Sequence, residues 1–208
     1  MIFPDGEYLR NIFTSTYLRY VVSPIVCASQ NTDVRSERQW YAMRVTYGRE
    51  IVVKKELDKI GAETFVPMRD VVEIRGKRRI RRRIPAISNL LFIHATSAWM
   101  SAFKAATKLP IRYIMDPMTH EPLIVPEHQM TPFIKVAAHS DDAEVEFLPP
   151  SFSTAGRGTR VLVTEGIFAG TEGVFMRIRG DRRVVVSIPG IAAVATHFIH
   201  PSHLKILT

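Results

Sequence analysis

The sequence is short of several features that would define its class. Cys27 is the single cysteine among 208 residues, which excludes an internal disulfide framework and a cysteine-rich zinc site and fits a reducing cytoplasm. The apolar run at 20–28 is interrupted by Pro24 and is too short to span a bilayer, which takes about 20 apolar residues. We therefore expect a cytoplasmic protein that has no contact with a membrane.

Motifs for catalysis and metal binding are also missing. Ser101 and Lys104 match the S-x-x-K pattern of serine acyltransferases, but the accompanying S-D-N and K-T-G elements are absent. The glycines at 166–173 are not followed by the Gly-Lys-Ser/Thr of a phosphate-binding loop. Three histidines recur at 197–203, but Pro201 breaks any helix that would align them as metal ligands. We predict a protein that is not an enzyme and has no cofactor or metal. A DNA-binding repressor is also disfavoured, because the sequence shows no helix-turn-helix.

Acidic residues are outnumbered, at 20 against 28 lysines and arginines, and the resulting net charge of +8 indicates a polyanionic partner. The charge is uneven along the chain. Residues 38–136 carry 18 basic and 9 acidic residues, and 158–208 carry 6 and 3. Between them, 137–157 holds 1 basic and 4 acidic residues with two adjacent prolines, which is typical of a linker. We therefore predict two domains, at 38–136 and 158–208, with 1–37 as a poorly ordered extension.

Hydrophobic periodicity changes repeatedly within 38–136. Strands and helices alternate, which predicts an α+β sandwich of the ferredoxin-like type. The expected elements are strands at 40–46, 63–67, 88–94 and 111–115, a hairpin joining 71–74 to 80–84, a helix from about 50 to Gly61, a helix from a Ser97 cap to about 109, and a last helix with Pro126 in its first turn.

The second domain opens with the stretch GTRVLVTEGIFAGTEGVF at 158–175. Its apolar residues alternate with a period of two, as in a half-buried strand. Gly166 and Gly170 tolerate the positive φ of a tight turn, and Gly173 can start the next strand. The run VVVSI at 184–188 has high β propensity. The sequence therefore predicts a small β-barrel.

Two stretches together resemble one family. The 158–175 segment resembles the KOW motif, and WYAMRVTYGRE at 40–50 resembles the start of the NusG N-terminal domain. This resemblance implies a ferredoxin-like NusG N-terminal domain followed by a small SH3-like β-barrel (KOW) domain. In one specialised relative the second domain can refold as a helical hairpin, but the β propensity at 184–188 predicts a barrel at rest here.

Four stretches, the first of them inside 40–50, resemble specialised NusG paralogues of Bacteroides-type bacteria, which antiterminate transcription of surface-polysaccharide operons. They are VTYGRE at 45–50, IRYIMD at 111–116, RGDRRVVVSIPGI at 179–191 and ATHFIHPSHL at 195–204. One departure is Ser88-Asn89-Leu90, which stands where housekeeping NusG has Pro-Gly-Tyr before its central strand. Leucine thus replaces an aromatic ring that is often presented to RNA polymerase.

The resemblance implies that the first domain binds the clamp helices of RNA polymerase and suppresses pausing. Its apolar contact surface would comprise Leu90 and Phe92, with Ile114, Phe65 and Pro67 nearby. The alternative is that these residues are ordinary core, because exposed apolar side chains are informative only as a patch.

The segment RGKRRIRRR carries the strongest charge signal, with seven basic residues in nine positions. Such side chains bind phosphates independently of sequence. Together with the resemblance, this charge implies contact with DNA of the transcription bubble. A solvated hairpin whose charge prevents aggregation is the alternative. The resemblance implies a second nucleic-acid contact at Thr46, Tyr47 and Arg49, where Tyr47 would stack on an extruded base. The nucleic-acid candidates are Thr46, Tyr47, Arg49, Arg75, Lys77, Arg78, Arg79, Arg81, Arg82 and Arg83.

The KOW-like domain resembles modules that bind ribosomal protein, the termination factor Rho or RNA. The candidate partner-facing side chains are Ile167 and Phe168, at the tip of the loop that contains Gly166 and Gly170 and precedes Gly173. For Phe168 the alternative is packing into the barrel. Three functions stay open for a chain that we expect to be monomeric: an operon-specific antiterminator, a housekeeping NusG-like factor that couples polymerase to Rho or the ribosome, and a KOW protein that binds ribosomal RNA.

Overall fold

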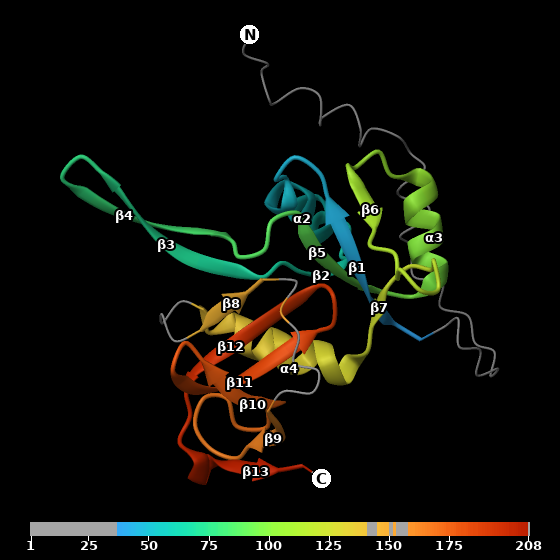
Figure 1. Ribbon diagram of the computed structural model, residues 1–208. Coiled ribbons are helices and arrows are strands. Elements are labelled where there is room, and N and C mark those ends of the chain that lie inside the picture. The colour runs from blue at the N-terminus through green and yellow to red at the C-terminus, as the bar shows by residue number, and fades with distance from the viewer. Residues whose placement is uncertain (1–36, 141–144, 150–151, 153–157, 208) are drawn as a thin grey trace.

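The computed structural model describes residues 37–140, 145–149, 152 and 158–207. The predicted extension at 1–37 lies outside these residues except for Glu37. A sheet with helices forms the upper half of Figure 1, and a barrel of short strands lies below it. This arrangement confirms the predicted α+β fold class. Among the described helices, none has the length and apolar character needed to cross a bilayer.

The first sheet consists of five antiparallel strands. They are β1 (Gln39–Val45), β2 (Glu63–Phe65), β5 (Leu90–Ala95), β6 (Ile111–Tyr113) and β7 (Ile124–Val125). β1 lies between β5 on one side and β6 and β7 on the other, and β2 extends the sheet beyond β5. β1 and β5 are buried on both faces, which explains why their sequences are apolar almost throughout.

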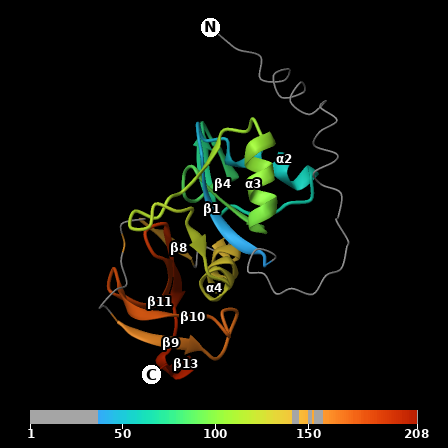
Figure 2. The ribbon, with the colours of Figure 1, turned by 90° about the vertical axis from the view of Figure 1, so that its right-hand side faces the viewer.

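One face of this sheet is covered by α2 (Glu50–Lys59) and α3 (Ser97–Ala106). Figure 2 shows both helices on the same side of β1. Because side chains alternate along a strand, Tyr41, Met43 and Val45 all point to this side and join one core with the helices.

The start of α3 differs from the prediction by one residue. Thr96, with extended backbone, is the N-cap, and its hydroxyl accepts a hydrogen bond of 3.2 Å from the backbone N–H of Trp99. Ser97, which the sequence predicted as the cap, is instead the first helical residue. The helix ends at Ala106 because Thr107 returns to extended backbone, about one turn earlier than expected.

The other face of the sheet is covered by α4 (Glu127–Ala138), which begins directly after Pro126. Phe133 of this helix packs edge-on against Phe92 of β5, with ring centroids 6.2 Å apart, and against Phe65 of β2 at 6.3 Å. Offset and edge-on aromatic contacts of this kind add to the burial energy of a core.

The predicted hairpin is a long two-stranded ribbon formed by β3 (Met68–Arg75) and β4 (Arg78–Pro85). All eight residues of each strand pair in register, from Met68 opposite Pro85 to Arg75 opposite Arg78. Gly76 begins the two-residue turn with a φ of +60°, which glycine adopts without steric cost. The ribbon projects away from the body in Figure 1 and pairs with no other described strand.

The second sheet is a barrel-like unit of six antiparallel strands. Its members are β8 (Glu146–Leu148), β9 (Thr159–Val163), β10 (Glu172–Ile178), β11 (Asp181–Ile188), β12 (Ala192–Phe198) and β13 (Leu204–Ile206), with a 3-10 turn at Pro201–His203. They are ordered β13-β9-β10-β11-β12-β8. β8 lies within 137–157, the segment that the sequence marks as a linker, and extends the barrel sheet by pairing with β12.

The two halves of the molecule share a core. Met130, Phe133 and Val136 of α4 belong to the same buried cluster as Val184 of β11 and Val194 of β12. Both views show α4 lying between the sheet and the barrel (Figures 1 and 2). The barrel is therefore packed on the first domain rather than held by a linker alone.

Candidate functional site

The predicted polymerase-contact residues lie together on the α4 side of the sheet, but the structure covers most of them. Leu90 is 3% exposed, Phe92 is fully buried and Pro67 is buried. Phe65 and Ile114 are half-buried and pack against the same cluster. Because α4 packs directly on this face and the barrel packs on α4, the face has little surface to offer a partner.

The contact between α4 and the barrel includes the loop at 165–170. Phe168 is 2% exposed, and its ring lies 5.5 Å from that of His139 at the end of α4. The ammonium of Lys135, one turn earlier on α4, donates a hydrogen bond to the carbonyl of Ala169. Ile167, next to Phe168, remains 48% exposed. Of the two candidate partner-facing residues, the structure thus encloses Phe168 and exposes Ile167.

The three glycines of the KOW-like stretch have two different roles. Gly166 and Gly170 have φ values of +81° and +82°, as the turn prediction requires. Gly173 lies in β10, where a Cβ would be 2.6 Å from a methyl carbon of Val184 and 2.8 Å from the carbonyl oxygen of Val185. Close packing between strands therefore requires glycine at that position.

All seven basic residues predicted between Arg75 and Arg83 are exposed on the ribbon. Some of them form ion pairs within the ribbon: Glu73 binds Arg75 at 2.9 Å and Arg82 at 3.2 Å, and Asp70 binds Arg81. The hydrogen bonds from Arg75 and then Arg82 lower the pKa of Glu73 from its usual value. The carboxylate of Glu73 offsets part of the ribbon's positive charge.

The other nucleic-acid candidates, Thr46, Tyr47 and Arg49, lie elsewhere, in the turn between β1 and α2. Tyr47 is 86% exposed and has a φ of +63°, a region that bulky residues seldom adopt. A non-glycine residue held in this conformation costs about 1–3 kcal/mol and is often found at functional sites. Thr46 anchors the turn, since its N–H and its hydroxyl both reach the carbonyl oxygen of Pro110, at 3.0 and 3.3 Å.

Asn89 and Glu50, which were not among the predicted site residues, hold this turn against β5. The side-chain oxygen of Asn89 accepts a hydrogen bond of 3.2 Å from the N–H of Gly48, and the N–H of Asn89 donates to the carboxylate of Glu50. Asn89 has a φ of +62°. This value explains why asparagine, the side chain that best tolerates left-handed backbone, can stand where the resemblance has glycine.

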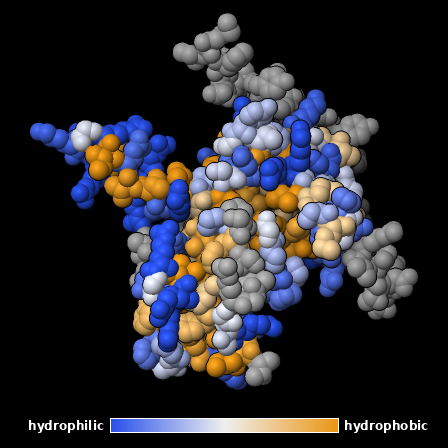
Figure 3. Space-filling model, viewed as in Figure 1, coloured by the Kyte–Doolittle hydropathy of each residue, from blue (hydrophilic) through white to orange (hydrophobic). Residues whose placement is uncertain are grey.

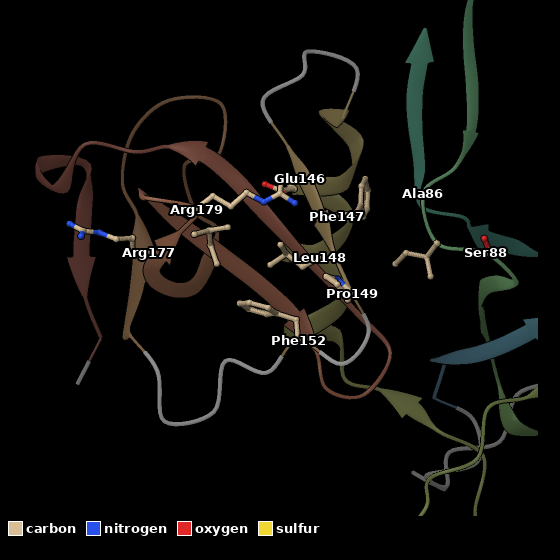
Figure 4. A pocket seen from close by; sticks show the side chains of 11 residues that line it. Ala86, Ser88, Glu146, Phe147, Leu148, Pro149, Phe152, Arg177 and Arg179 are labelled. Atoms are coloured by element: carbon tan, nitrogen blue, oxygen red, sulfur yellow. The ribbon is translucent and has the colours of Figure 1, made fainter. Parts of the chain in front are cut away.

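A groove of ≈ 780 Å³ separates the base of the ribbon from the barrel. Figure 4 shows Phe147 between β8 and the segment that carries Ala86 and Ser88. Glu146 on the same strand forms ion pairs with Arg179 at 2.9 Å and with Arg183 at 3.1 Å. The groove exists because the two halves meet at this point, so it depends on their association.

A family model and a solved structure are similar to this chain. Residues 38–134 match the family model NusG, described as transcription termination factor nusG. A solved structure titled "Domain interaction in Thermotoga maritima NusG" aligns with 83% of this chain and 98% of its own, at 17% identity and a TM-score of 0.43. A search of the curated proteins found no match. Residues 38–134 are thus similar to the NusG family, and a small β-barrel follows them.

Proposed function

We propose that this chain is a transcription factor that binds RNA polymerase and suppresses pausing or termination, at surface-polysaccharide operons in particular. The NusG-family match over 38–134 is the observation that carries the general role in transcript elongation and termination. The narrower role is supported by the specialised likeness of 111–116 and 179–191 and by Leu90, which replaces the usual aromatic residue.

The polymerase would bind the α4 side of the sheet. Phe65 and Ile114 are half-buried at the margin of that apolar cluster, so they are the side chains best placed for contact. Leu90 and Phe92 lie beneath, and Phe92 supports Phe65 at a ring distance of 6.4 Å. In this proposal the barrel leaves α4, which packs on this face, when the clamp helices bind.

Nucleic acid would be contacted at two other places, the basic ribbon and the turn at Tyr47. Both are exposed in the closed arrangement, so they are available before the barrel moves. The freed barrel would present Phe168 as well as Ile167 to a ribosomal protein, Rho or RNA. We propose no chemical step, because the candidate residues serve contacts rather than a reaction.

The direct test is a pull-down of the full chain on core RNA polymerase, with Phe65→Ser as the variant. Val52→Ser is the matched control, since Val52 is 40% exposed on α2, on the opposite side of the sheet. Phe92→Ala is less informative, because truncating a buried phenylalanine costs about 3–5 kcal/mol of stability by itself. We expect Phe65→Ser to lose binding and Val52→Ser to keep it.

A Rho-binding assay separates the antiterminator from a housekeeping factor. Tight binding to Rho at wild-type strength would favour the housekeeping role, and tight binding to ribosomal RNA without any binding to polymerase would move the chain to translation. Absence of polymerase binding, in the wild type and in a variant with the barrel released, would contradict the proposal.

A further inference from the structure

The β3–β4 ribbon has an excess of positive charge that its own carboxylates do not neutralise. Residues 68–85 contain eight lysines and arginines and two acidic residues, a net charge of +6. Arg75 lies directly opposite Arg78 at the tip, and like charges facing each other destabilise a strand pair. Lys77, Arg78 and Arg79 form no ion pair with any residue that the structure describes. A polyanion bound to the ribbon would relieve this repulsion.

The ribbon also exposes apolar side chains among its arginines. Val72 is 63% exposed and Ile74 is 68% exposed, and their spacing of two places them on the same face of β3. The residues opposite them, Arg81 and Arg79, share that face. Figure 3 shows apolar surface on the projecting ribbon, bordered by hydrophilic residues. The face therefore combines aliphatic groups with guanidinium groups, and bulk solvent is a poor partner for the former.

These features favour one kind of polyanion. Sites for single-stranded nucleic acid stack bases on aromatic side chains, and 68–85 contains no phenylalanine, tyrosine, tryptophan or histidine. The major groove of duplex RNA is too deep and narrow for side chains to read. The major groove of B-DNA is about 12 Å wide and admits a two-stranded β-ribbon. Strands of eight residues span about 26 Å at 3.3 Å per residue, enough to follow the groove across several base pairs.

We propose that the ribbon binds duplex DNA in the major groove, with Val72 and Ile74 toward the base edges. Arg79 and Arg81, whose longer side chains share that face, would extend to the flanking phosphates. Aliphatic side chains at the base edges contact the methyl group of thymine, and arginines neutralise phosphates regardless of sequence. This inference rests on the proposed function, because binding to a transcribing polymerase would bring the ribbon close to the DNA duplex. The binding itself needs no polymerase and can be measured separately.

The experiment is a titration of the full chain against a labelled DNA duplex, followed by fluorescence anisotropy. Parallel titrations use one of its single strands, the RNA duplex of the same sequence, and a DNA duplex in which uracil replaces thymine. We expect the thymine duplex to bind tightest. Uracil lacks the C5-methyl group, so each contacted methyl is worth about a fourfold difference in affinity, from about 0.8 kcal/mol per buried carbon.

Two double variants separate the apolar from the charged contribution. In Val72→Ser with Ile74→Ser, the difference between thymine and uracil duplexes should vanish while the salt dependence stays. In Arg78→Gln with Arg79→Gln, the slope of log affinity against log salt should fall by about 2, at about 0.9 per phosphate contact. The control removes two exposed lysines outside the ribbon, Lys55→Gln with Lys108→Gln, and should leave the slope unchanged.

Equal or tighter binding to single-stranded DNA or to duplex RNA would overturn the inference, as would equal affinity for thymine and uracil duplexes. A slope that falls equally in the lysine control would mean that net charge, rather than the ribbon, sets the binding. The polymerase pull-down with the same double variants keeps the two proposals apart. If the wild type and these variants bind polymerase but the wild type does not bind duplex DNA, the inference fails and the proposed function stands.

Discussion

At the residue scale, Asn89 links the fold to the turn that presents Tyr47. It combines left-handed backbone, φ +62°, with a side-chain hydrogen bond to the N–H of Gly48. We predict that Asn89→Ala lowers the free energy of unfolding by about 2 kcal/mol, about 1 for left-handed alanine and about 1 for the lost bond. Asn89→Gly should cost less, because glycine accepts the backbone. Urea denaturation followed by circular dichroism measures both, and equal costs would contradict this role.

At the scale of the element, the start of α3 gives a sharp comparison between neighbours. Thr96→Ala removes the hydroxyl that accepts from Trp99, and loss of such a cap costs about 1 kcal/mol. Ser97→Ala, one residue later, should change stability by less than about 0.5 kcal/mol, since Ser97 is already helical. The same denaturation experiment decides between the two positions; a larger loss for Ser97→Ala would restore the cap that the sequence predicted.

The elements also show how far sequence reasoning reaches. Strands such as β1 and β5 could be predicted because their apolar pattern is dictated by burial. β8 was missed because three residues in an acidic, proline-bounded segment become a strand only through pairing with β12. For the candidate site, the apolar pattern placed Phe92 in a central strand. It could not predict which element covers that face of the sheet. Core and contact surface are equally apolar, so only the fold distinguishes them.

At the scale of the whole molecule, the shared core between α4 and the barrel couples the domains. If polymerase needs the surface of α4 that the barrel occupies, the closed state must open before polymerase can bind. The apparent affinity then falls by the fraction of molecules that are open. Residues that hold the barrel on α4 stabilise the closed state. They should therefore weaken polymerase binding although they do not contact polymerase. Phe168, enclosed beside His139, is the clearest of them.

The measurement that tests this account most directly is the affinity for core RNA polymerase of Phe168→Asp beside that of Ile167→Asp. Both variants add one negative charge to the same loop, but only Phe168 is buried against α4, while Ile167 is 48% exposed. We predict that Phe168→Asp binds at least about tenfold tighter, which corresponds to about 1.4 kcal/mol of closed-state stability removed, with Ile167→Asp near the wild type. Equal affinities, or weaker binding by Phe168→Asp with its first domain folded, would contradict the account.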